Sequence, residues 1–281
     1  VMDLVNKKNL SRKIDMILFH HNSIRKGLKK KLVNKKKLLR DLSRISTKIL
    51  KYSKPIWKKL DEFKRKNKII LFEGAQGMLL DIDHGTYPFV TSSNTVAGAA
   101  SAGSGCGPDT INYILGIVKA YTTRVGEGPF PTELKNAIGN KIGIKGKEFG
   151  TVTNRKRRCG WFDAVLVKQS CTISGTKGIA LTKIDVLDDL KYIYICTSYK
   201  LNGKTIDYFP SSLQDQTKIK PIYKKFNGWL TNTSGTKYWK DLPKNAKKYI
   251  EFIKNFCGVK ISSISTSPKR EDTILLENPF K

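Results

Sequence analysis

A short motif at the end of an apolar run has the residue types and spacing of a purine-binding motif. The motif is "LTKID", residues 181–185. A carboxylate can accept hydrogen bonds from the N1 and N2 donors of guanine, while the methylene stem of a lysine two residues earlier lies across the purine face. Lys183 and Asp185 therefore indicate a guanine site, with an ion pair between these two side chains as the structural alternative.

A basic run, "TVTNRKRRCGW" at residues 151–161, favours a small anionic ligand. Arg155 and Arg157 are spaced by one residue, and each guanidinium can form paired hydrogen bonds with a carboxylate or phosphate. The hydroxyls of Thr151 and Thr153 add donors. The alternative for such a run is a solvated or RNA-contacting surface.

Two further segments have the composition of shaped loops. Residues 73–95, "EGAQGMLLDIDHGTYPFVTSSNT", contain no Lys or Arg and are rich in small polar residues, as in loops that enclose a ligand. Within them, Gln76 is a neutral amide that can donate to a developing oxyanion. Residues 123–134, "TRVGEGPFPTEL", predict a stiff turn after a strand.

Hydrophobic periodicity predicts a mixed α/β chain around these motifs. Residues 7–66 predict two or three basic amphipathic helices. Strands are expected at 68–72, 121–125, 178–185 and 260–266, helices at 108–120, 161–173 and 243–258, and a hairpin about Asn202-Gly203. The fold class is α/β, with a largely parallel central sheet flanked by helices and an antiparallel hairpin. We expect residues 1–66 to be a helical segment packing on a core formed by residues 67–281, together one incomplete domain.

Composition limits the class of protein. The 281 residues include 53 Lys and Arg against 23 Asp and Glu, a formal net charge of +30 that attracts anions. Five scattered cysteines without a Cys-x-x-Cys pair suit a reducing cytoplasm, and the histidines show no zinc spacing. The sequence shows no membrane-spanning run. Nucleic-acid binding has only the charge in its favour.

Together these segments resemble one family, the adenylosuccinate synthetases, which join aspartate to inosine monophosphate (IMP) using GTP. The segments "DIDHGTYPFVTSSNT", "GPFPTEL", "NRKRRCGW", "LTKIDVLD" and "ISTSPKREDTI" occur in the order of the family. The resemblance covers the whole chain and is strongest between residues 72 and 188. It implies a P-loop-NTPase-like synthetase fold, a ligase that forms a C–N bond in AMP biosynthesis, Mg²⁺ as cofactor, and a homodimer whose active sites are completed across the interface.

The resemblance also implies roles for single residues. Gln76 would bond the purine oxygen that becomes phosphorylated, Thr91 the nucleotide phosphate and Val125 the ribose, and Arg155 would touch both the IMP sugar and aspartate. The residues implied for aspartate are Thr151, Val152, Thr153, Asn154, Arg155, Lys156 and Arg157. Those implied for GTP are Arg157, Lys183, Ile184, Asp185, Ser265, Thr266 and Ser267.

The chain departs from the family pattern in three places. Val152-Thr153-Asn154 stands where the family usually has Thr-Thr-Gly, and Ser267 replaces a usual Gly, which puts aspartate affinity in question. The glycine-rich phosphate loop, the general-base Asp, the acid His and the magnesium ligands find no match. We therefore expect the C-terminal portion of a synthetase, truncated at its N-terminus and inactive alone. The alternatives are a remnant that only binds nucleotide and a basic RNA-binding protein.

Overall fold

The computed structural model describes residues 1–150 and 155–278, and the chain divides into two compact units, Val1–Lys68 and Ile69–Lys281. Thr151, Val152, Thr153 and Asn154 of the predicted aspartate site lie outside the described residues. Within the described ranges, no helix is long and apolar enough to cross a lipid bilayer.

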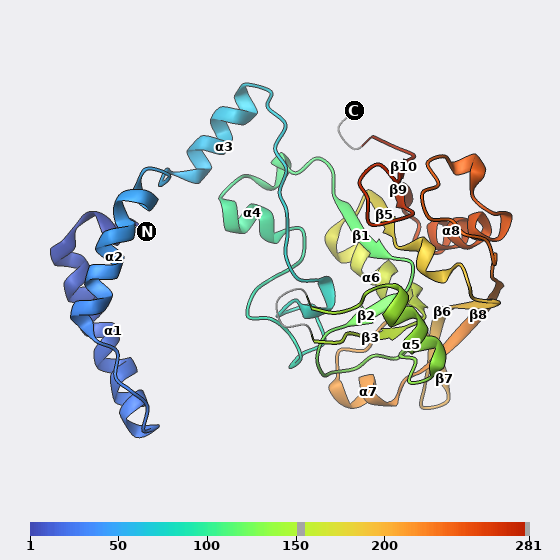
Figure 1. Cartoon of the computed structure of the whole chain (residues 1–281), viewed down its shortest axis with the longest axis horizontal. Helices are drawn as coiled ribbons and strands as arrows, with labels where there is room; N and C mark the ends of the chain where they lie inside the picture. The colour runs from blue at the N-terminus through green and yellow to red at the C-terminus, as the bar shows by residue number, and fades with distance from the viewer. Residues whose placement is uncertain (151–154, 279–281) are drawn as a thin grey trace. The chain divides into compact units, whose positions relative to one another are not determined.

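The first unit contains three helices, which confirms the prediction of basic amphipathic helices for this segment. They are α1 (Lys7–Gly27), α2 (Lys35–Leu50) and α3 (Ile56–Arg65) (Figure 1). The side chains of Asn6 and Asn34 accept hydrogen bonds from the first turns of α1 and α2, which satisfies backbone donors that a helix start leaves free. Leu10, Ile14 and Leu18 recur every fourth residue on α1 and pack against leucines of α2.

The second unit is built on a largely parallel sheet, as predicted. Its strand order is β1 (Leu115–Lys119), β5 (Gly178–Thr182), β9 (Lys260–Ser265) and β10 (Thr273–Leu275). β1, β5 and β9 run parallel, and β10 is antiparallel to β9. Because parallel strands end at the same edge of a sheet, the segments that follow β1, β5 and β9 lie close together.

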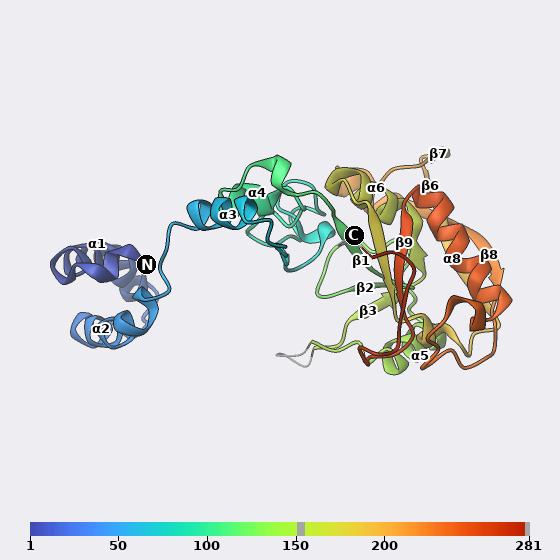
Figure 2. The same ribbon diagram turned by 90° about the horizontal axis from the view of Figure 1, so that it is seen from above.

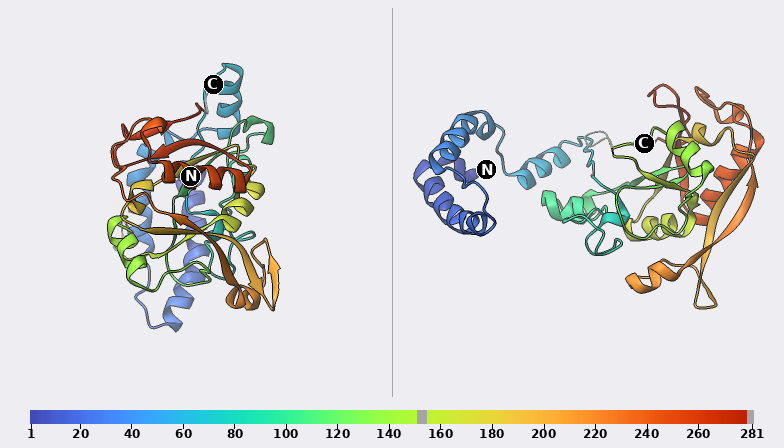
Figure 3. Two further views of the ribbon diagram at one scale, coloured as in Figure 1. Left: turned by 90° about the vertical axis from the view of Figure 1, so that its right-hand side faces the viewer. Right: turned by 60° about the horizontal axis from the view of Figure 1, so that its bottom comes forward.

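A second sheet contains the predicted hairpin. β6 (Tyr192–Leu201) pairs in antiparallel fashion with β7 (Lys204–Ile206) and β8 (Lys220–Asn227), and in parallel with β4 (Phe162–Asp163). Asn202 and Gly203 connect β6 to β7 with φ of 48° and 83°, the left-handed geometry of a two-residue hairpin turn. Figure 3 shows β6 and β8 as long paired strands.

Two helices fill the space between the sheets. α6 (Ala164–Ser174) contacts β6 and α8 (Lys244–Cys257), and α8 in turn contacts β8 and β9 (Figure 2). Tyr249, Ile250 and Ile253 of α8 enter the main core beside Ile179 and Leu181 of β5. The remaining elements are β2 (Thr122–Arg124), β3 (Arg158–Gly160), α4 (Ala99–Ser104), α5 (Ala137–Lys145) and α7 (Leu213–Lys218).

Two sequence predictions of secondary structure are wrong. Residues 68–72 form no strand with any described segment, and Ile69 and Leu71 are 74% and 75% exposed. An apolar run becomes a strand only when a neighbour supplies backbone hydrogen bonds. Residues 108–120, predicted as a helix, form a 3-10 turn at Pro108–Thr110 and then β1, because pairing with β5 satisfies this β-branched segment.

Candidate functional site

The predicted guanine residues meet at the ends of β5 and β9. Leu181 of β5 pairs with Ile264 of β9, so the segments beginning at Lys183 and Ser265 leave neighbouring strands side by side. Lys183 has a left-handed φ of 62° and precedes the 3-10 helix Ile184–Leu187. The side chain of Ile184 is buried in the main core, so only its backbone can face a ligand.

The Asp185 carboxylate has hydrogen-bonding capacity to spare. It is half-buried, and burial raises its pKa above the usual value. Within the described ranges, its only hydrogen bond is to its own backbone amide. The ammonium group of Lys183 lies on Glu148, at 2.9 Å from Oε1, which disfavours the structural alternative of a Lys183–Asp185 ion pair. A half-buried carboxylate with free lone pairs suits a pair of N–H donors such as those of guanine.

The side chains of the loop after β9 form hydrogen bonds mainly within the loop itself. Ser267 Oγ donates to Asp272 Oδ2 at 2.6 Å and accepts from the backbone N–H of Lys269 at 3.0 Å. The hydroxyl of Thr266 donates to backbone carbonyl oxygens, and Ser265 Oγ donates to the Ser267 carbonyl oxygen at 2.8 Å. The serine that replaces the usual glycine is therefore buried and bonded within its own loop.

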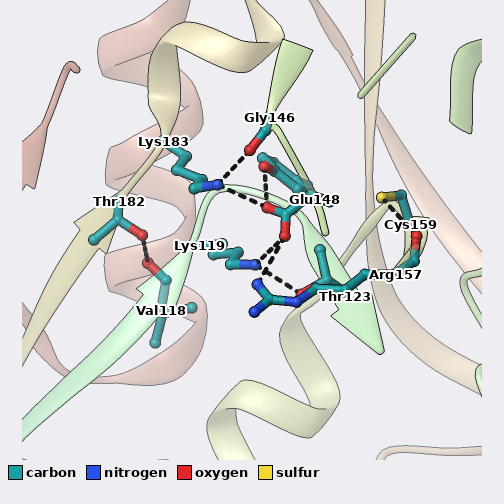
Figure 4. Close-up of polar contacts among 10 residues, drawn as sticks. Val118, Lys119, Thr123, Gly146, Glu148, Arg157, Cys159, Thr182 and Lys183 are labelled. Carbon is teal, nitrogen blue, oxygen red and sulfur yellow. Dashed lines mark hydrogen bonds and ion pairs between the residues drawn. The ribbon is translucent and has the colours of Figure 1, made fainter. Parts of the chain in front are cut away.

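A buried carboxylate that the sequence analysis did not identify lies beside the guanine residues. Glu148 is fully buried, and four side chains donate to it (Figure 4). Tyr121 Oη and Lys183 Nζ donate to Oε1 at 2.6 and 2.9 Å, and Lys119 Nζ and Arg157 Nη1 donate to Oε2 at 2.7 and 3.0 Å. We call these five residues the Glu148 cluster. It brings together two predicted site residues, Lys183 and Arg157.

The basic run lies antiparallel to the segment that contains Glu148. The backbone N–H of Arg157 donates to the Glu148 carbonyl oxygen at 2.9 Å, and Phe149 and Lys156 form an antiparallel bridge. Arg155 is exposed and has no side-chain contact with the Glu148 cluster among the described residues, while Lys156 Nζ donates to Asn140 Oδ1. Arg157 Nε is buried and has no hydrogen-bond partner among the described residues.

A single carboxylate, Asp81, organises the lysine-free loop of residues 73–95. Its Oδ1 accepts from the backbone N–H groups of Asp83 and His84, and its Oδ2 from those of Thr95 and Val96. Burial acts to raise the pKa of Asp81, but these backbone donors outweigh burial and hold the pKa well below its usual value. The loop is thus wrapped around one fully buried side chain.

Of the four residues predicted for IMP, Gln76, Thr91 and Val125 lie in or beside this loop, and Arg155 lies in the basic run. The backbone N–H of Thr91 donates to the Leu80 carbonyl oxygen at 2.8 Å. Arg124, the last residue of β2, donates to Thr86 Oγ1 at 2.8 Å and so ties the loop to the segment that contains exposed Val125. Gln76 is exposed with φ of 71°, and its side chain forms no hydrogen bond with the residues that the structure describes. The structure therefore joins the segments of Thr91 and Val125 but does not bring Gln76 onto them.

The Glu148 cluster should make the stability of the protein depend on pH. Burial alone would raise the pKa of Glu148, but hydrogen bonds from Lys119, Tyr121 and Lys183 outweigh it and lower the pKa to about 2. The stabilising contribution is therefore complete above the unfolded pKa near 4.5 and is lost as the pH falls toward 2, by about 3 kcal/mol. Urea unfolding between pH 6 and 3 should show about 2 kcal/mol of this loss. A Glu148→Gln variant with the same pH slope as the parent would contradict it.

Metal ligands do not gather in the described part of the chain. Among residues 1–150 and 155–278, no group of three or more His, Cys, Asp and Glu side chains is placed to hold a metal ion. These residues do not form a complete magnesium site.

Comparison with known proteins shows the family of the chain. Residues 1–274 match the sequence model of the adenylosuccinate synthetase family. A solved structure described as fully ligated adenylosuccinate synthetase from Plasmodium falciparum is 34% identical, with a TM-score of 0.93. The match covers 98% of this chain and 65% of that one, so this chain spans less than two thirds of that relative. A second match is the succinoaminodeoxyadenylate synthetase of cyanophage S-2L bound to dGMP and dATP. It is 16% identical over 79% of this chain and 50% of that one, with a TM-score of 0.48.

The match over residues 1–274 includes β1, β5 and β9, the loop around Asp81 and the Glu148 cluster. On the strength of this match, the chain belongs to the adenylosuccinate synthetase family.

Proposed function

We propose that the protein ligates L-aspartate to IMP at the expense of GTP, giving adenylosuccinate, GDP and phosphate. The family match over residues 1–274 carries this proposal. Support comes from the edge of the parallel sheet, where Lys183, Asp185 and Ser265 leave adjacent strands with an unpaired carboxylate among them. Arg157 lies beside them on Glu148 and supplies a cation for an anionic substrate.

The proposed reaction has two steps. The γ-phosphoryl group of GTP passes to the purine oxygen of IMP, and this converts a poor leaving group into phosphate. The amine of aspartate then attacks the purine carbon that bears this oxygen and displaces the phosphate, so that a C–N bond forms as the C–O bond breaks. Gln76 would donate a hydrogen bond to the oxygen while it carries charge, Thr91 and Val125 would contact IMP, and Arg155 and Arg157 would bind aspartate.

The finer features of the family are proposals for this chain. We propose Mg²⁺ as the companion of the GTP phosphates, with most of its ligands outside the described residues. We also propose a homodimer in the cytoplasm, a compartment that suits the five free cysteines. A monomer in sedimentation experiments at micromolar concentration would argue against the dimer.

Nucleotide preference and product formation test the function directly. In calorimetry we expect GTP to bind at least about 100-fold more tightly than ATP, because ATP cannot offer the N1 and N2 donors that Asp185 requires. Equal binding of the two nucleotides would remove the guanine assignment. Chromatographic detection of adenylosuccinate from IMP, aspartate and GTP, with each substrate omitted in turn, tests the ligase reaction itself.

A further inference from the structure

We propose that Glu148 is a positioning residue that links the guanine site to the aspartate site, because its two carboxylate oxygens bind Lys183 and Arg157. This inference rests on the proposed function. Its physical basis is the Glu148 cluster (Figure 4). Oε1 accepts a hydrogen bond from Lys183, which follows β5, and Oε2 accepts one from Arg157, which precedes β3.

The first half of the link orients the Lys183 side chain. A lysine stem packs along an apolar face while its charged group stays at the edge, so fixing the ammonium group beyond the edge of the base holds the stem across the purine. Lys183 Nζ is fixed by Glu148 Oε1 and by the carbonyl oxygen of Gly146, and the left-handed backbone of Lys183 sets where the stem begins. Glu148 therefore determines the position of a side chain that is predicted to contact the base.

The second half concerns Arg157. Its Nη1 shares Oε2 with Lys119, whose ammonium group also donates to Thr123 Oγ1 on β2 at 2.9 Å. Lys119 and Tyr121 are not among the predicted site residues. Their hydrogen bonds hold the Glu148 carboxylate in place, so that it does not move with Lys183 or Arg157. The carboxylate is fully buried, so water does not screen the charges around it as it would at the surface.

The charge balance gives the sign of the coupling. Three cations share one anion, so they repel each other across Glu148. An anionic ligand on Arg157 offsets part of that repulsion and leaves more of the carboxylate's attraction for Lys183. Aspartate should therefore strengthen GTP binding, and by reciprocity GTP should strengthen aspartate binding to the same extent.

Calorimetry with a GTP analogue whose γ-phosphoryl group cannot be transferred, with and without saturating aspartate and with IMP present throughout, measures this coupling without turnover. For the parent protein we expect aspartate to lower the Kd of this GTP analogue at least about fivefold. In Glu148→Asp the negative charge remains but the side chain is one methylene too short to reach both Lys183 and Arg157. The ratio of the Kd without aspartate to the Kd with aspartate should then fall below about twofold. If Glu148 only neutralised buried cations, Glu148→Asp would retain the full ratio, and that result would overturn the proposal.

Glu133→Asp is the matched control. Glu133 binds the adjacent Arg158 through two hydrogen bonds of 2.7 and 2.6 Å but contacts neither Lys183 nor Arg157, so this variant should keep the parental ratio. Loss of coupling in both variants would also overturn the proposal. Should Glu148→Asp not fold, Tyr121→Phe provides the comparison, because it removes the hydroxyl that donates to Glu148 Oε1 at 2.6 Å while the charge of Glu148 remains, and the coupling should again fall. A parent that binds GTP tightly without any effect of aspartate would overturn the link alone, whereas a parent that does not bind GTP would overturn the proposed function as well.

Discussion

Replacing Asp185 with asparagine should change the nucleotide preference from guanine to xanthine. In the proposed site the carboxylate accepts from two N–H donors of guanine, and hydrogen bonds to charged groups contribute about 1.5–3 kcal/mol each. Asparagine keeps one acceptor for N1–H but turns an N–H toward the N2 donor, so one bond is lost and GTP binding should weaken at least about tenfold. An amide presents one donor and one acceptor, which matches the carbonyl oxygen that xanthine carries in place of the guanine amino group. Calorimetry with GTP and xanthosine triphosphate measures both changes.

Asp188→Asn is the control for this experiment. Asp188 lies three residues further on and is buried, but it accepts from Trp229 Nε1 at 2.6 Å and from the backbone and hydroxyl of Thr233. Its loss should lower the unfolding temperature without producing xanthine binding. If Asp185→Asn left the affinity for GTP unchanged, Asp185 would be a structural residue and the guanine assignment would be lost.

Replacing Asp81 with alanine should unfold the loop of residues 73–95 while the sheet remains folded. The change leaves four partly buried backbone donors without an acceptor, and each costs up to about 1–3 kcal/mol. Because adjacent donors can regain water once the loop opens, we expect a local loss of about 3–5 kcal/mol. Thr91 belongs to this loop, so IMP binding should weaken at least about tenfold.

Hydrogen exchange and limited proteolysis detect this change best. Amide protection should fall within residues 73–95 and persist in β5 and β9. Asp83→Ala is the comparison, because Asp83 is exposed and its carboxylate contacts only Asn94 among the described residues. Unaltered protection of the loop in Asp81→Ala would show that Asp81 does not organise it.

The elements that the sequence predicted well carry their signals locally. Asn202-Gly203 supplies the positive φ angles of a hairpin turn, and α8 ends at Gly258, whose φ is 66°. α6 begins after Asp163, which accepts from the backbone of Leu166, and ends at Gly175. In each case the residues that determine the structure lie within four positions of it, so periodicity and capping were sufficient.

The elements that were missed depend on partners far along the chain. β1 is a strand because β5, about sixty residues later, pairs with it, and nothing within residues 108–120 reveals that neighbour. The Glu148 cluster is similar. Lys119, Tyr121 and Lys183 lie 29, 27 and 35 positions from Glu148, so only the folded chain shows a glutamate in a lysine-rich segment to be a shared anchor. The predicted roles of all the site residues, Gln76 and Arg155 included, stay predictions.

Among the cysteines that the structure describes, burial leaves one partly accessible thiol. Cys159, Cys171, Cys196 and Cys257 are buried, and burial raises the pKa of each, to about 11 for Cys159 and about 12 for Cys257. Thiolates are the reactive form, so these four sulfurs are poor nucleophiles at neutral pH. Cys106, just after α4, is only partly buried. A maleimide dye or spin label would therefore attach at one known point without prior mutagenesis, which suits spectroscopic studies of the folded enzyme.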